Sequence, residues 1–137
     1  MVATYFAAPN LETGHVATYI AGASIAANTL VKMDSTEGQV INTAAITDVA
    51  IGVALNTVAS GEQVQVQTSG VAKILTTAVA IATIGSQVMP DGGGGGKIAV
   101  AAGATAVSVG LTEQAAAGSD VIKVRLCVPN LKAPANV

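Results

Sequence analysis

The segment most open to a chemical interpretation is a run of five glycines followed by a lysine, Gly92–Lys97. A phosphate-binding loop has four residues between its two key glycines, then Lys and Ser or Thr at the start of a helix. Here Asp91 stands where the first key glycine belongs, and Ile98 follows the lysine. The next residues have the composition of a strand. We therefore interpret the glycines as a flexible hairpin loop without phosphate-binding function.

The chain has one cysteine, Cys127, and one histidine, His15, so a catalytic thiol would have to use this pair. The pairing would span nearly the whole chain, and nothing else in the sequence supports it. A single cysteine also excludes an intrachain disulfide. We expect Cys127 to be a small buried hydrophobic residue in a strand.

Paired carboxylates act as general acid and base when they share a pocket that separates their pKa values. The acidic residues of this chain fall mostly at expected turns and strand ends, where solvated acids are common. The eight are Glu12, Asp34, Glu37, Asp48, Glu62, Asp91, Glu113 and Asp120. They form no cluster with His or Cys at metal-ligand spacing. We expect no catalytic, cofactor-binding or metal-binding residues, and no enzyme activity.

Charged residues make up 10% of the 137-residue chain, against a usual share of about 25%. The net charge is −2 and the six basic residues are scattered, whereas nucleic-acid binding needs a basic patch. Three aromatic residues are few for a small-molecule pocket. Much of the surface should be small, apolar or hydroxylated. Either neighbouring subunits cover such a surface, or a monomer exposes many Ala and Thr.

All three aromatic residues, Tyr5, Phe6 and Tyr19, lie in the first twenty positions. Their rings either anchor an N-terminal arm on a partner or cover the domain's own core. No basic segment precedes the apolar residues of the N-terminus, which argues against a secretory signal. The uncharged stretches are diluted by polar residues, so we expect no transmembrane helix and synthesis in the cytoplasm without secretion.

Strand patterns dominate the rest of the sequence. Gln63–Gln67 and Val121–Leu126 alternate between polar and apolar residues, and turn-forming Gly, Ser, Asp and Pro separate such segments. The sequence predicts an all-β fold, a compact β-sandwich or barrel-like domain. At most one or two short helices are expected, near Thr76–Ile84 and Ala23–Asn28, where Ala is frequent.

An internal repeat organises these strands. A shift of 58 positions aligns Gly38–Val66 with Gly96–Val124 without a gap. Identical residues meet at Gly38 and Gly96, Ala44 and Ala102, Thr47 and Thr105, Val49 and Val107, Gly52 and Gly110, Ala59 and Ala117, and Val66 and Val124. Two units are too few for a solenoid, so they should pack together as one domain, 1–137. We divide it into an N-terminal arm (1–22), repeat units 23–75 and 76–126, and a C-terminal tail (127–137).

The repeated pattern resembles the capsid cement, or head decoration, proteins of tailed phages. This family was formerly a domain of unknown function, and some of its members carry the label recombinase. The resemblance rests on Ile51–Leu55, Ala59–Glu62 and Val64–Val71, with a weaker second copy in Val109–Leu111 and Ala116–Leu126. The runs Ala21–Val31 and Ile84–Val88 extend it over roughly residues 15–126.

The resemblance implies a structural virion protein that binds the outer surface of a phage head. It would bridge major capsid proteins as a homotrimer and stabilise the shell without chemistry. Candidate contacts with the capsid or another subunit are Tyr5, Phe6, Tyr19 and Leu131. The alternatives are another phage structural β module of the tail, fibre or surface-layer type, and an enzyme or nucleic-acid protein, for which the sequence offers neither a phosphate loop nor a basic patch.

Overall fold

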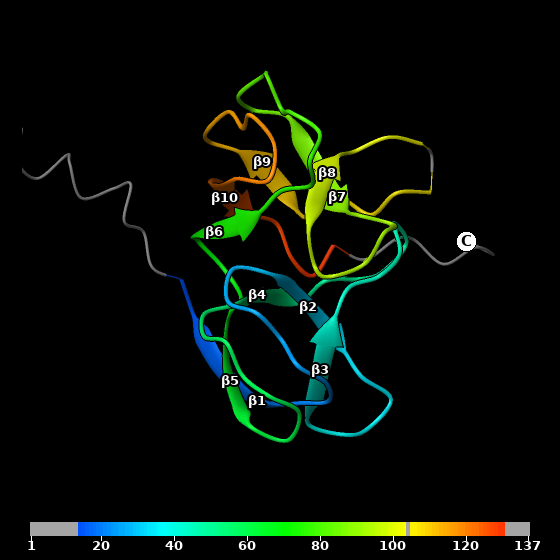
Figure 1. Cartoon of the computed structure of the whole chain (residues 1–137), viewed down its shortest axis with the longest axis vertical. Helices are drawn as coiled ribbons and strands as arrows, with labels where there is room; N and C mark the ends of the chain where they lie inside the picture. The colour runs from blue at the N-terminus through cyan, green and yellow to red at the C-terminus, as the bar shows by residue number, and fades with distance from the viewer. Residues whose placement is uncertain (1–13, 104, 131–137) are drawn as a thin grey trace, which may run out of the picture.

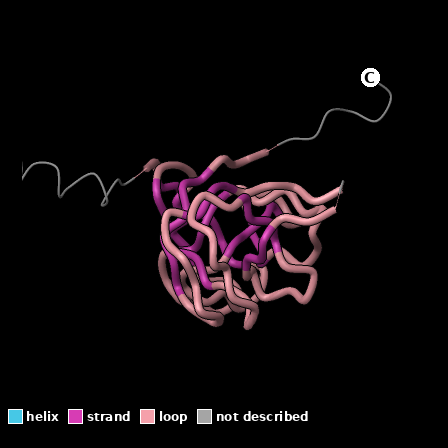
Figure 2. The backbone as a smooth tube through the Cα atoms, turned by 90° about the horizontal axis from the view of Figure 1, so that it is seen from above, coloured by secondary structure: helices cyan, strands magenta, loops and turns pink. Residues whose placement is uncertain are grey.

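The computed structural model describes residues 14–103 and 105–130, which form ten strands and no helix (Figures 1 and 2). The strands of the first half are β1 (Val16–Ala21), β2 (Leu30–Met33), β3 (Gln39–Asn42), β4 (Gly52–Ala54) and β5 (Gln63–Gln67). Those of the second half are β6 (Val71–Leu75), β7 (Gln87–Pro90), β8 (Ile98–Val100), β9 (Gly110–Thr112) and β10 (Val121–Leu126). The all-β prediction is confirmed, and so are the strands expected from the two alternating segments.

The first five strands, which we call the first unit, form a small closed barrel in the order β1-β3-β2-β4-β5. β1 closes it, because it pairs antiparallel with β5 along its length and parallel with β3 at Ile20 and Ala21. Valines that alternate along β5 point inward: Val64 and Val66 are buried, whereas Gln63 and Gln65 are exposed. The period of two therefore separates a barrel interior from a polar exterior.

The last five strands, which we call the second unit, have the order β6-β10-β9-β7-β8. This is the strand order of the first unit, opened between β6 and β8. One parallel bridge, Thr76 to Ile98, spans the opening. It corresponds to the parallel pair of Ala21 and Val40 that joins β1 to β3 in the first unit. The second unit is thus a barrel of the same design with a weaker closure, and it lies above the first in Figure 1.

Equivalent strands of the two units are related by nearly the 58-residue shift that the repeat predicts. A shift of 58 places β4 on β9 and the start of β5 on that of β10, and a shift of 57 places β2 on β7. The isolated bridges agree: Ile25 to Val58 in the first unit has its counterpart in Ile81 to Ala116. This correspondence supports the predicted duplication, because register and turn geometry repeat along with sequence.

Gly52 follows Ile51, and Gly110 follows Val109 at the equivalent position of the second unit. Each of these glycines allows a neighbouring strand to approach closely. A Cβ atom on Gly52 would collide with the backbone carbonyl of Gln67 on β5. On Gly110 it would collide with the backbone carbonyl of Arg125 on β10, the equivalent position. A glycine inside a strand often marks such an approach of another backbone.

Neither of the two candidate short helices forms, which the predicted limit of at most one or two allows. Ala23–Asn28 and Thr76–Ile84 are irregular connections between strands, and each holds an isolated bridge instead of a helical turn. The backbones of Ile25 and Val58 exchange two hydrogen bonds, as do those of Ile81 and Ala116. Tertiary pairing of Ile25 and Ile81 with these distant partners therefore outweighs the helix propensity of the alanines around them.

The strands divide the chain at a different point from the predicted unit boundaries. β1 falls within residues 1–22, which were set apart as an arm, yet it closes the first barrel. β6 was assigned to the first repeat, yet it pairs with β10 of the second unit over five residues. The gapless part of the repeat begins only at Gly38, so the sequence does not show which sheet either strand joins.

The two units share a packed seam. Leu30, Ala50 and Val53 of the first unit belong to the same buried cluster as the core of the second unit. A separate cluster fills the interior of the first unit. The linker after β5 is fixed by the buried side chain of Gln67, whose Nε2 donates to the carbonyls of Ser69 and Val71.

Candidate interaction surfaces

The structure describes one of the four predicted contact residues. Tyr5, Phe6 and Leu131 lie outside the described residues. Tyr19 lies on β1 and is partly buried against the core cluster of the first unit. Its ring therefore covers the domain's own core, which is the second of the two alternatives that the sequence left open for it.

The glycine loop joins β7 to β8 and packs against the first unit. Gly94, Gly95 and Gly96 have positive φ angles of 86°, 76° and 67°. The carbonyl of Gly96 accepts from the amide of Leu30, and its amide donates to the carbonyl of Thr43. A strand, and not a helix, follows this loop. The amide of Gly96 forms a hydrogen bond across the seam between the units. The geometry therefore agrees with a hairpin loop and not with a phosphate cradle.

Cys127 does not have the predicted location. It follows β10 as an exposed residue with a free thiol, since the alternation that buries Ile122, Val124 and Leu126 places the next residue on the outer side. It lines a shallow hollow of about 290 Å³ together with Leu111 and Asn130. Among the residues that the structure describes, no group of three or more His, Cys, Asp or Glu is arranged to hold a metal ion.

Two acids have the shared turn role that their repeat positions predict. A carboxylate oxygen of Glu62 accepts from the amide of Ala59 at 2.6 Å. A carboxylate oxygen of Asp120 accepts from the amide of Ala117 at 2.8 Å. Each carboxylate therefore stabilises the turn that precedes an alternating strand, β5 or β10.

Asp48 organises a loop of the first unit without a counterpart in the second. Its carboxylate accepts from the amides of Ala44 and Ala45 and pairs with Lys32 at 3.0 Å. Burial raises the pKa of Asp48, but these two amides and the lysine outweigh it and hold the pKa below its usual range. Met89 and Ala106 occupy the positions of Lys32 and Asp48 in the second unit.

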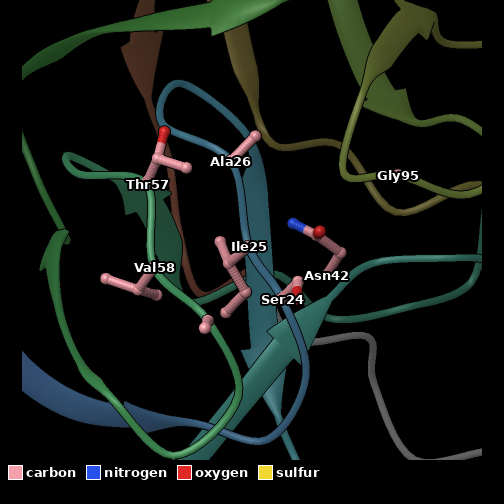
Figure 3. A pocket seen from close by; sticks show the side chains of 8 residues that line it. Ser24, Ile25, Ala26, Asn42, Thr57, Val58 and Gly95 are labelled. Carbon is pink, nitrogen blue, oxygen red and sulfur yellow. The ribbon is translucent and has the colours of Figure 1, made fainter.

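The largest hollow of those described here opens beside the seam and has a volume of about 560 Å³ (Figure 3). Its wall combines small, apolar and hydroxyl side chains: Ser24, Ile25, Ala26, Asn42, Thr57, Val58, Ala59 and Gly95. The Asn42 amide already donates to the carbonyl of Leu30 and to the hydroxyl of Thr29. No titratable side chain lines this hollow, so it offers shape without acid–base chemistry.

Large apolar side chains are exposed mainly on the second unit. Five of the eight such residues lie there: Val79, Ile84, Val100, Leu111 and Val121. The other three are Val16, Met33 and Leu55. The most exposed, Val79 at 71% and Ile84 at 64%, lie in the connection from β6 to β7.

Charge is divided between the units as well. The first unit has one base, Lys32, against four acids, Asp34, Glu37, Asp48 and Glu62. The second has four bases, Lys73, Lys97, Lys123 and Arg125, against three acids, Asp91, Glu113 and Asp120. The first unit is thus acidic, and the second is weakly basic and more apolar on its surface.

Three of these bases meet on the outer side of β6 and β10, a surface we call the basic face. Lys73 and Lys123 are directly opposite each other in the antiparallel ladder. Arg125 lies two residues further along β10 and pairs with Glu113 at 2.8 Å. Val121 and Leu111 are exposed on the same side.

Sequence reasoning missed the basic face because it treated the six bases as scattered. Lys123 and Arg125 alternate with buried Ile122 and Val124, which is a visible signal for one polar strand face. Lys73 joins them only through the pairing of β6 with β10, which the sequence does not specify.

No helix in the described part of the chain is long and apolar enough to cross a membrane.

Comparison with known proteins first supports the architecture. The chain is similar to the solved structure of the head fiber gp8.5 N base in bacteriophage phi29, with a TM-score of 0.64 and 15% identity. The match covers 87% of this chain and 98% of that one, so both units belong to the shared fold. None of the curated proteins matches the chain.

The sequence comparison shows the family. A family model described as phage cement protein matches residues 11–126, which include all ten strands. The chain therefore belongs to the phage cement protein family, as the repeated motifs predicted. It is a phage structural protein of the virion capsid, built from one closed β-barrel and a five-stranded sheet of the same strand order.

Proposed function

We propose that this chain is a head decoration protein that binds the outer surface of a phage capsid and bridges neighbouring major capsid proteins. Family membership supports the location. The uneven distribution of exposed apolar side chains carries the proposal, because it gives the second unit a surface suited to burial against a partner. The function requires no catalytic group, cofactor or small-molecule substrate.

The proposed mechanism is reinforcement by repeated weak contacts. A homotrimer would present the same patch three times around one axis, and linked contacts raise the overall affinity without any new interface. An area of about 800 Å² per partner is ordinary for each contact. Bridging two capsid subunits at several such sites would oppose their separation when the packaged genome presses outward.

Purified protein mixed with phage heads that lack it tests this function. We expect saturable co-sedimentation with the heads, a higher temperature for rupture of the decorated heads, and a trimeric mass in solution. A strictly monomeric chain without affinity for such heads would contradict the proposal.

A base for a longer appendage is the second candidate function. The similarity to a head fiber base favours it, since both units of this chain fit that fold. Decorated heads would then show projections above the shell in electron micrographs. A layer of density that bridges capsomers would favour the cement role.

A further inference from the structure

We propose that the basic face is a docking surface for an acidic segment of the shell protein, with Lys73 and Lys123 as its specificity-determining residues. The proposal rests on the proposed function, because it names the surface and the partner chemistry through which the chain would bind a capsid. The proposed partner carries carboxylates flanked by apolar side chains.

Two like charges directly oppose each other on the basic face. Lys73 and Lys123 are cross-strand partners in the middle of the β6–β10 ladder, where like charges destabilise a sheet. Among the described residues, neither lysine forms an ion pair. This pair of lysines lowers the stability of the free protein. Carboxylates of a partner that lie between the two ammonium groups would offset the repulsion and favour binding.

The equivalent surface of the first unit has a neutral pair in place of the two lysines. There Thr18 on β1 opposes Gln65 on β5, and both side chains are exposed and uncharged. The same fold therefore accommodates a neutral pair at this position. The lysines of the second unit are not required by the architecture.

A carboxylate and two exposed apolar side chains lie on the same side of the sheet as the lysines. Glu113 reaches Arg125 at 2.8 Å, which shows that a carboxylate fits against this side of the sheet. Val121 is 42% exposed and Leu111 is 40% exposed, so apolar contacts flank the charges. Apolar contact with complementary charge gives both affinity and selectivity in protein interfaces.

Transplanting the first unit's residues is the sharpest test. The double variant Lys73→Thr with Lys123→Gln keeps side chains that this fold already accepts at the equivalent positions. Its binding to DNA-free shells of the same phage should be measured by sedimentation at several salt concentrations. Lys97→Gln, a change in the β7–β8 loop, serves as a control for loss of positive charge from the same unit.

We expect the double variant to bind the shells roughly tenfold more weakly or worse and with a shallower salt dependence. The control should stay within about twofold of the unchanged protein, since surface charges outside an interface contribute little. Equal affinity and salt dependence for the double variant and the unchanged protein would overturn the proposal. Failure of the unchanged protein to bind shells would instead contradict the proposed function.

Two further outcomes would assign the basic face to another partner and overturn the proposal. One is a loss of self-association of the purified double variant without loss of shell binding. The face would then contact a second copy, whose first unit is acidic. The other is a loss of affinity for free duplex DNA alone.

Discussion

The first and second units have the same strand order but present different surfaces. The first is a closed barrel with exposed glutamines along β5 and an excess of acids. The second is closed by a single bridge between its edge strands and exposes lysine, arginine and large apolar side chains. Their buried strand faces and the turns held by Glu62 and Asp120 stay alike, whereas their exteriors differ. This contrast indicates that the shared features support folding and that the differences serve binding.

Replacing the glycines that both units share should have the largest effect. Gly52→Ala and Gly110→Ala each place a Cβ against the carbonyl of a neighbouring strand. We expect each to lower the free energy of unfolding by about 3 kcal/mol or more, since backbone cannot move aside as a flexible side chain can. Chemical denaturation measures both. A small effect at one position only would break the structural equivalence of the units.

A comparison of Gly96 with Gly38 separates the contribution of packing at the seam from that of the turn conformation. The two are repeat equivalents with φ angles of 67° and 76°. A Cβ on Gly38 meets nothing, whereas on Gly96 it would lie 2.5 Å from the carbonyl oxygen of Leu30. We expect Gly38→Ala to cost about 1 kcal/mol and Gly96→Ala about 3 kcal/mol. The difference measures how tightly the glycine loop packs on the first unit, and equal costs would contradict this seam.

A substitution at Asp48 tests the loop that this carboxylate holds in the first unit and that has no counterpart in the second. Asp48→Asn should lower the free energy of unfolding by about 1–2 kcal/mol at neutral pH, because it removes a charged acceptor. The pKa of Asp48 is lowered in the folded state, so its contribution is present above the unfolded-state pKa. It is lost as the pH falls through the folded pKa.

The difference between the Asp48→Asn variant and the unchanged protein should therefore shrink below about pH 4. Denaturation curves at pH 7 and pH 3 give the comparison. Ala106→Ser, at the corresponding half-buried position of the second unit, should change stability little at either pH. A constant difference across pH would show that Asp48 acts through packing and not through charge.

The smallest expected effect concerns the basic face. Lys73→Thr with Lys123→Gln should raise the free energy of unfolding by about 0.5 kcal/mol, since it removes a like-charge cross-strand pair. The reverse exchange, Thr18→Lys with Gln65→Lys, should lower it by a similar amount. A loss of stability in the first variant would indicate that the lysines support the fold.

Local sequence pattern was sufficient to predict the all-β fold and two of its strands. Gln63–Gln67 and Val121–Leu126 alternate strictly enough to fix both strand and inward face, and the repeat predicted the equivalence of Gly52 with Gly110. Ala23–Asn28 was misassigned because its conformation depends on Val58, about thirty residues away. Cys127 was misassigned because its apolar character was given more weight than the alternation of β10, which places the residue after buried Leu126 on the outer side.

The basic face could not be predicted from local sequence pattern. Lys73 and Lys123 are fifty positions apart in the chain and become neighbours only through the β6–β10 pairing. The exposure of Val79 and Ile84 likewise depends on the irregular path that the connection takes after β6. The predicted contacts Tyr5, Phe6, Tyr19 and Leu131 remain predictions, and Tyr19 also packs against the first unit's core.

The central claim is that the first unit supports the fold while the second faces the shell. Electron cryomicroscopy of heads with and without this protein tests it most directly. The account predicts added density on the outer surface between capsomers, with β6, β9 and β10 against the shell and the loops of the first unit farthest from it. Density that places the first unit on the shell, or no added density at saturating protein, would contradict the account.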